Sequence, residues 1–383
     1  METLDQVFVL MKRAMLHAAE TFLPDEAIVF LSILISVTAI CIFGPLTMMY
    51  LTLLERKFVG RIQNRYGPNR VGKWGLLQPI ADGIKMLTKE DVVPTPADKF
   101  AHLLAPIVIV IPALLVFAVI PFGRGMTAVN LSIGLLFFLA LSSTTTIWIF
   151  VAAWASRNKF SLLGGMRSVA QMISYEIPMV LSVVPVLLAV GSFSTEAIVE
   201  AQAHGKWFIL TPWGIVGFLL FFLTGVAEVN RTPFDLPEGE SEIVAGFHTE
   251  YSGMKFALFY MAEFMSSFTI SAIVATVYLG GWHGPFLPSW LWLLAKSYLL
   301  ILVMMWFRGT LPRFRVDQFM GFAWKFLLPL ALLNILAAGL WVEFPFPKNY
   351  LFSGLAVAGS VFILYAANAP EMPRKRTYRY ADE

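Results

Sequence analysis

Nine apolar segments of membrane-crossing length constrain the fold of this chain more than any other feature. A transmembrane helix needs about 20 predominantly apolar residues. Such segments occur at 27–54, 101–121, 131–155, 172–190, 211–230, 256–280, 290–307, 326–343 and 350–368. Only 14% of the residues are charged, whereas about a quarter are charged in a soluble domain. The sequence therefore predicts an all-α integral membrane protein, a polytopic helical bundle with 8–9 transmembrane helices.

The whole chain, 1–383, is expected to form a single integral membrane domain, because no long linker, repeat or second soluble region separates the apolar segments. Residues 1–24 lack a long apolar core behind Lys12 and Arg13. We therefore expect an interfacial lead-in there and no cleavable signal peptide.

Lysine and arginine are distributed unevenly between the two sides of this arrangement. The loops and the tail on one side hold 22 of the 28 Lys and Arg residues. The positive-inside rule assigns that side to the cytoplasm. It includes a first cytoplasmic loop at 55–100, an acidic loop at 231–255 and a basic tail at 369–383. With nine helices the N-terminus lies outside and the C-terminus is cytoplasmic.

Four carboxylates form a layer toward the predicted cytoplasmic ends of the apolar segments, namely Glu55, Glu176, Glu228 and Glu263. A single acid at a helix end is ordinarily a snorkelling group, and that alternative stays open for Glu55. Glu176 stands beside Tyr175, where simple helix packing is the alternative. A carboxylate inside the membrane is costly and marks a proton or ion pathway by default. We interpret the layer as a proton relay, because close carboxylates in a poorly solvated site titrate jointly.

The stretch EVNRTPFDLPEGESEIVAGFHTEYSG, residues 228–253, concentrates further acids at the junction of two apolar segments. These additional acids are Asp235, Glu238, Glu240, Glu242 and Glu250. Several acids at one junction strengthen the prediction of a relay.

The first cytoplasmic loop joins a basic start, which includes Arg56 and Arg65, to an amphipathic second half. The basic residues either contact lipid phosphates or line a mouth through which the polar head of an amphiphile leaves the bilayer. The second half predicts an amphipathic helix on the membrane surface. Its apolar face consists of Leu77, Ile80, Ile84 and Leu87.

The sequence lacks the cysteine and histidine patterns that would hold a redox or metal cofactor. Cys41 is the only cysteine, and the five histidines are scattered. A disulfide, an iron–sulfur cluster, a cysteine-built zinc site and a bis-histidine haem are therefore not expected. No phosphate loop or dinucleotide fingerprint is present, and we expect neither a bound metal nor a nucleic-acid partner. Any electron carrier must belong to other chains.

Seven spaced motifs give the chain a specific resemblance to a known family. They are LLERK at 53–57, GPNRVG at 67–72, LLQPIADGIKMLTKED at 76–91, AQMISYEIP at 170–178, the stretch at 228–253, ALFYMAEF at 257–264 and LPRFRVDQ at 311–318. In this order and over nearly the whole chain, they resemble the H subunit of proton-pumping NADH:quinone oxidoreductase, respiratory complex I. The mitochondrial counterpart is the first NADH dehydrogenase subunit.

The resemblance implies a membrane subunit in a bacterial inner membrane that forms part of the quinone-binding chamber and begins a path of buried carboxylates toward the pumping subunits. It assigns the ten acids Glu55, Asp82, Glu176, Glu228, Asp235, Glu238, Glu240, Glu242, Glu250 and Glu263 to the proton or charge relay. It assigns Arg56, Arg65, Arg231 and Arg308 to the quinone chamber. Quinone is the expected substrate, and FMN and iron–sulfur clusters are expected in partner subunits. The implied partners are peripheral-arm quinone-site subunits, antiporter-like membrane subunits and membrane lipids.

Two positions depart from the family pattern, and two other classes of protein remain open. Lys73 stands where proline is common, and Val316 replaces a frequent tyrosine, which puts any phenolic role there in doubt. The ninth apolar segment occurs only in some family members.

A coupling subunit of a membrane-bound hydrogenase would share the acids but not the quinone. A stand-alone ion transporter would also hold intramembrane acids, with a repeat that is not seen here.

Overall fold

The computed structural model describes residues 5–20, 24–237, 239 and 244–367, and every regular element in these ranges is helical. The helices are α2 (Val7–Glu20), α3 (Asp25–Ile62), α4 (Gln78–Thr88), α5 (Lys99–Val108), α6 (Val110–Leu115), α7 (Gly134–Ala155), α8 (Lys159–Val190), α9 (Thr195–His204), α10 (Pro212–Glu228), α12 (Gly253–Tyr278), α13 (Ser289–Thr310), α14 (Val316–Phe322), α15 (Leu328–Glu343) and α16 (Lys348–Ala367). Short 3-10 turns lie at Lys73–Gly75, Val116–Val119, Phe208–Leu210 and Gly246–His248, and a π-helical turn at Ala323–Leu327 joins α14 to α15.

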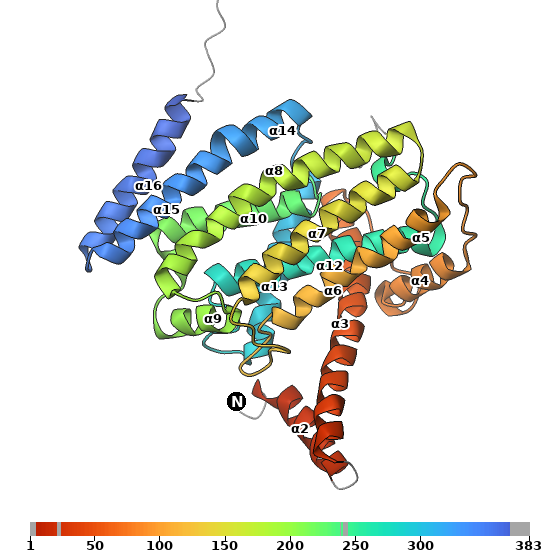
Figure 1. Cartoon of the computed structure of the whole chain (residues 1–383), viewed down its shortest axis with the longest axis horizontal. Coiled ribbons are helices and arrows are strands. Elements are labelled where there is room, and N and C mark those ends of the chain that lie inside the picture. The colour runs from red at the N-terminus through yellow and green to blue at the C-terminus, as the bar shows by residue number, and fades with distance from the viewer. Residues whose placement is uncertain (1–4, 21–23, 238, 240–243, 368–383) are drawn as a thin grey trace, which may run out of the picture.

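The predicted polytopic bundle is confirmed. Seven helical segments are long and apolar enough to cross a membrane, and α10 and the stretch Lys348–Leu364 of α16 are shorter apolar helices. Each of the nine apolar segments of the sequence corresponds to one of these. In the described part of the chain, successive apolar helices such as α7 and α8, and α15 and α16, pack against each other (Figure 1).

Helix α12 forms the centre of the bundle, and α3 lies at its edge. In the most apolar stretch of α12, 67% of the residues are buried inside the protein, compared with 6% in the most apolar stretch of α3. Helix α12 contacts α3, α5, α6, α10 and α13. The N-terminal half of α3 projects away from the other helices with α2 beside it (Figure 1), and α2 has no buried residue.

Two helices extend beyond the apolar segments of the sequence, and both carry acids of the predicted relay. Helix α8 begins at Lys159, where the Asn158 side chain accepts a hydrogen bond from the Phe160 amide, and not near 172. The hydropathy pattern does not reveal its first turns as helical, because they are polar and glycine-rich although they pack against neighbouring elements. Helix α3 continues to Ile62, past the predicted end at 54. Glu55 and Glu176 therefore lie inside helices and not at helix ends.

The predicted surface helix is present as α4, residues 78–88. Leu77, Ile80, Ile84 and Leu87 are all exposed and form its apolar face. An uncovered apolar face on a helix outside the bundle is the arrangement expected at a membrane surface. At the opposite edge of the bundle, α16 packs against α15 and α10 (Figure 1).

Candidate functional site

Four charged side chains from three helices and one loop meet where α3, α12 and α13 approach each other. Arg231 Nη1 lies 2.6 Å from Glu55 Oε2, and Arg231 Nε lies 2.8 Å from Glu263 Oε1. The second oxygen of Glu55 accepts a hydrogen bond from Arg308 at the end of α13. We call Glu55, Arg231, Glu263 and Arg308 the charge cluster. Because two arginines face two carboxylates, the cluster carries no net charge when all four groups are ionised.

The backbone that carries Arg231 is fixed by one buried glutamine of α8. Helix α10 ends at Glu228, and Asn230 adopts a left-handed conformation with φ of 55°. Gln171 is fully buried and its amide nitrogen donates to the carbonyl oxygens of Ala227 (2.8 Å) and Phe234 (2.8 Å). The same nitrogen also lies 3.0 Å from Asn230 Oδ1. Gln171 therefore fixes the backbone on both sides of Arg231.

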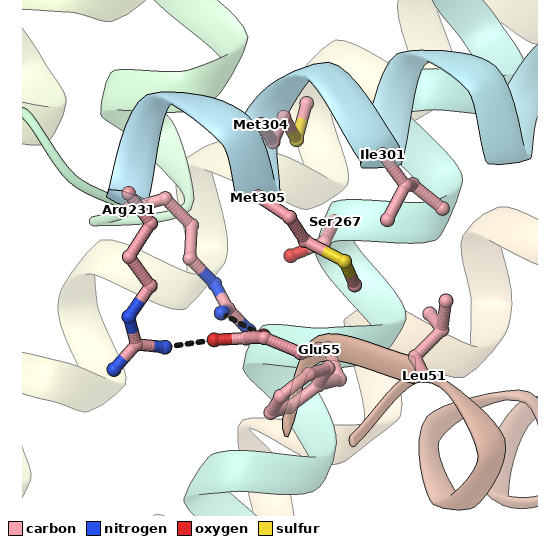
Figure 2. A pocket seen from close by; sticks show the side chains of 9 residues that line it. Leu51, Glu55, Arg231, Ser267, Ile301, Met304 and Met305 are labelled. Atoms are coloured by element: carbon pink, nitrogen blue, oxygen red, sulfur yellow. Dashed lines mark hydrogen bonds and ion pairs between the residues drawn. The ribbon is translucent and has the colours of Figure 1, made fainter. Parts of the chain in front are cut away.

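A small cavity of about 20 Å³ lies against the charge cluster. Figure 2 shows the carboxylate of Glu55 on one side of it and the apolar side chains of Leu51, Ile301 and Met305 on the other. A volume of roughly 10–15 Å³ is needed for one water molecule. This cavity therefore has room for about one water molecule and none for a quinone ring.

Two further cavities continue from the charge cluster along α12. One has a volume of about 50 Å³ and is lined by Glu263, Glu228, Asn230 and His248, among other residues. The other has a volume of about 30 Å³ and is lined by Glu228 with Ser142 and Thr145 of α7. Glu228 and Ser266 border both cavities. The carboxylates of α10 and α12 are thus joined by space of the size of a few water molecules.

Glu228 lies at the far end of this row from the charge cluster, and Glu176 of α8, which lines none of the cavities, interacts electrostatically with it. The side chain of Glu228 is buried, and among the described residues neither of its carboxylate oxygens has a hydrogen-bond partner. Glu176 accepts a hydrogen bond from Ser143 of α7. A buried carboxylate without a direct partner is costly unless it is protonated or hydrated, and the two adjoining cavities supply the room for water.

The other acids of the region are paired outside the row of cavities. Asp235 Oδ2 lies 2.9 Å from Arg313 Nη2, and burial raises the pKa of Asp235 although Arg313, Arg308 and Arg231 oppose the shift. Glu250 accepts a hydrogen bond of 2.6 Å from Asn158. Asp82 pairs with Arg56 at 2.6 Å on the surface, with half of the Arg56 side chain exposed.

Comparison with known proteins assigns the family. Residues 35–339 match the family model described as NADH dehydrogenase. The second H subunit of NADH-quinone oxidoreductase from Syntrophobacter fumaroxidans is 49% identical over 322 residues, which cover 82% of this chain and 96% of that protein. The chain belongs to the H-subunit family of NADH-quinone oxidoreductase.

Two more members of the family are similar to nearly the same extent. The H subunit of NADH-quinone oxidoreductase from Dehalococcoides mccartyi (strain CBDB1) is 55% identical over 282 residues, or 74% of this chain and 79% of that protein. The first H subunit from Geobacter sulfurreducens is 47% identical over 337 residues, or 82% of this chain and 96% of that protein. This chain is therefore a multi-pass membrane subunit of an enzyme complex, and its partners are the other subunits of complex I. Helix α16 lies beyond the range that the family model matches.

The structure brings part of the predicted complex I site together. Three of the ten predicted relay acids lie in the charge cluster or line its cavities: Glu55, Glu228 and Glu263. Glu176 is hydrogen-bonded to Ser143 of α7, and Asp235 is paired with Arg313. Asp82 and Glu250 pair elsewhere. Glu238, Glu240 and Glu242 lie outside the described residues. Of the predicted chamber arginines, Arg231 and Arg308 share a cavity wall, whereas Arg56 and Arg65 are exposed.

Sequence reasoning missed the polar residues that surround Glu228. Asn230, His248, Ser142 and Thr145 line its cavities. Because His248 does not lie in the middle of an apolar segment, the hydropathy pattern did not single it out. The position of His248 within the acidic loop was the signal that was available. Within the residues that the structure describes, no three His, Cys, Asp or Glu side chains form a group able to hold a metal ion.

Proposed function

We propose that this chain forms the membrane part of the quinone-binding chamber and couples quinone reduction to proton translocation through buried carboxylates. The observation that supports the proposal best is the continuity of the site. The ion pair of Arg231 with Glu263 joins the cavity at Glu55 to the cavities at Glu228. Every cavity in this row borders at least one carboxylate.

The quinone itself is proposed to bind between this chain and a peripheral-arm subunit. The cavity beside Glu55, about 20 Å³, is too small for a quinone head. The Arg308 side chain is 49% exposed, and Arg56 and Arg65 are also exposed. These guanidinium groups would face an anionic or partly reduced quinone that a second subunit covers, since arginine binds oxyanions through charge-assisted hydrogen bonds.

Coupling is proposed to begin with competition for the two arginines of the charge cluster. Complete reduction of a quinone takes up two electrons and two protons, and the electrons arrive from a partner subunit. Negative charge on the quinone attracts Arg308, which weakens its hold on Glu55. Glu55 and Glu263 then bind protons more readily, because an arginine close to a carboxylate favours its ionised form. Protonation of Glu263 releases Arg231 and changes the electrostatics at Glu228 across the shared cavity.

The surroundings of the chain follow from the same proposal. FMN and iron–sulfur clusters are assigned to partner subunits, and antiporter-like membrane subunits receive the protonation change beyond Glu176. The charged loops face the cytoplasm in a bacterial inner membrane, with the N-terminus outside, the C-terminus cytoplasmic and membrane lipids around the helices. Residues 1–383 act as a single integral membrane domain.

The proposal is tested with Glu228→Gln and Glu263→Gln in the assembled complex. Glu200 on α9, which is exposed, supplies the matched control Glu200→Gln. The measurement is the number of protons translocated per NADH oxidised in proteoliposomes, together with inhibitor-sensitive quinone reduction. We expect both site variants to assemble and to translocate fewer protons, while the control equals the wild type. Full proton stoichiometry in both site variants would falsify the proposal.

A further inference from the structure

His248 lies in the wall of the largest of the three cavities, although it is not one of the acids of the row. It ends the 3-10 turn Gly246–His248 and is 7% exposed. The cavity of about 50 Å³ is bordered by His248, by Glu228 at the end of α10 and by Glu263 on α12. The imidazole thus shares one hydratable cavity with the buried Glu228 and the partly exposed Glu263, which lie on different helices.

The backbone of this turn is held tightly against α8. Ser161 is fully buried and its hydroxyl donates to the carbonyl oxygen of Phe247 at 3.0 Å. At Gly164 a Cβ atom would lie 2.6 Å from the Cα of Gly246, so the two chain segments touch backbone to backbone. His248 is consequently fixed with respect to α8, the helix that also carries Glu176.

The imidazole ring is surrounded by the edges and faces of aromatic rings. Its centroid lies 5.4 Å from that of Phe256 and 6.4 Å from that of Tyr260, with interplanar angles of 67° and 69°. Phe247 stands perpendicular to it at 4.7 Å. These contacts limit rotation of the ring.

A neutral imidazole can both donate and accept a proton, one at each ring nitrogen, whereas an ionised carboxylate can only accept one. One ring nitrogen carries a proton that it can donate, and the other has a lone pair that can accept a proton. A proton that arrives at one nitrogen is balanced by the proton that leaves from the other, so the ring passes charge without keeping it. A cavity of about 50 Å³ has room for a few water molecules beside the ring and the two acids.

We propose that His248 is a proton-relay residue that transfers protons, through water in the shared cavity, between Glu263 and Glu228. The inference rests on the proposed function of the carboxylate path and adds one specific group to it. Among the described residues, the ionisable groups that line the same cavity as His248 are Glu228 from α10 and Glu263 and Tyr260 from α12. Asn230 contributes a neutral amide to the same wall.

The experiment replaces His248 by glutamine and by asparagine in the whole complex. Both amides keep a donor and an acceptor in the wall but cannot exchange a proton at neutral pH. His102→Gln is the matched control, because His102 is fully buried, stacks on Tyr251 at 4.0 Å and is not part of the cavity wall. Glu228→Gln is measured in parallel. The readouts are protons per NADH, the solvent deuterium isotope effect on turnover and the thermal midpoint.

We expect His248→Gln to assemble with an unchanged thermal midpoint, to turn over about five-fold more slowly or worse, and to show a larger solvent isotope effect. The control should leave the isotope effect unchanged. Normal proton translocation by His248→Gln, or slow turnover with an unchanged isotope effect, overturns the relay. Failure of both amide variants to assemble also overturns it, because His248 would then be a packing residue. If Glu228→Gln is impaired while His248→Gln is normal, only this inference fails; if Glu228→Gln is normal, the proposed function fails.

Discussion

Arg231 holds Glu55 at 2.6 Å and so ties the first long helix, α3, to the loop that follows α10. Its second contact, 2.8 Å to Glu263, extends the tie to α12 at the centre of the bundle. The Arg231 side chain is 11% exposed and that of Glu55 is 8% exposed. At such burial each charge depends on the opposite charges of the charge cluster, because a buried charge that loses a partner is poorly solvated.

The first prediction is a double-mutant cycle on this pair. Removal of one partner from a buried ion pair costs about 3–5 kcal/mol. We expect Glu55→Gln and Arg231→Met each to destabilise the protein by that order, and the double variant to lose clearly less than the sum of the two. Thermal or denaturant unfolding of the purified complex measures the effect, with Arg13→Met on the exposed face of α2 as the control. Strict additivity of the two changes would show that the contact carries no coupling.

The second prediction concerns Asp82, an acid that the family resemblance assigns to the relay. Its pair with Arg56 lies on the surface, with 26% and 52% of the two side chains exposed. Exposed ion pairs contribute roughly 0–1 kcal/mol. We expect Asp82→Asn to change the free energy of unfolding by less than about 0.5 kcal/mol and to retain the proton stoichiometry that Glu228→Gln loses. A loss of pumping equal to that of Glu228→Gln would return Asp82 to the relay.

The helices were predictable from the sequence because a lipid-exposed helix must be apolar over most of its length. All nine apolar segments are found as helices. The starts and ends of helices were less predictable where the surrounding protein replaces lipid. The first turns of α8, with Gly164, Gly165 and Ser168, are polar in composition yet buried by contacts within the protein. A hydropathy pattern cannot reveal such contacts.

The acids of the site were predictable as a group, but their connections were not. The cost of an intramembrane charge singled out Glu228 and Glu263 from the sequence alone. Arg231 bridges Glu55 and Glu263, Gln171 fixes its loop, and His248 lies in a cavity wall, and all three arrangements depend on tertiary contacts. These contacts join residues far apart in the sequence, 176 positions in the case of Arg231 and Glu55, and no local sequence pattern encodes them.

The third prediction uses the close contact between α8 and the acidic loop. A Cβ atom at Gly164 would lie 2.6 Å from the Cα of Gly246 and 3.0 Å from the amide nitrogen of Phe247. Backbone cannot yield as a flexible side chain can, so Gly164→Ala must displace the turn that carries His248. We expect slower turnover and fewer protons per NADH with the complex still assembled. Gly359→Ala on α16, where the added Cβ meets nothing within 4 Å, is the control.

The fourth prediction concerns the pH dependence of stability at His248. Burial lowers the pKa of His248 from an ordinary 6.5 to about 4. Between these values the unfolded state binds the proton more readily than the folded state, so stability is complete above about pH 6.5 and is lost as the pH falls toward 4. The loss from this one group amounts to at most about 3 kcal/mol. The thermal midpoint of His248→Gln should therefore fall less than that of the wild type between pH 7 and pH 5. Equal falls would mean that His248 is not the group that titrates.

The last prediction is a stability test at the end of the bundle away from the charge cluster. Lys296 of α13 is 7% exposed, and its ammonium group donates to the carbonyl oxygens of Leu279 (2.6 Å), Gly281 (2.8 Å) and His283 (2.8 Å). These carbonyls lie just past the C-terminus of α12, where a cation also complements the helix dipole.

Lys296→Met keeps the length of the side chain but removes all three donors. A buried carbonyl left without a partner costs about 1–3 kcal/mol, so we expect a loss of several kcal/mol and a clearly lower thermal midpoint. Lys206→Met, which removes an exposed ammonium group over the Tyr350 ring at 5.7 Å, should change the midpoint little. In Lys296→Met complexes that remain assembled, the proton stoichiometry should equal that of the wild type, because the charge cluster and its cavities do not include Lys296. A reduced stoichiometry without a change in the midpoint would instead make Lys296 part of the proton path.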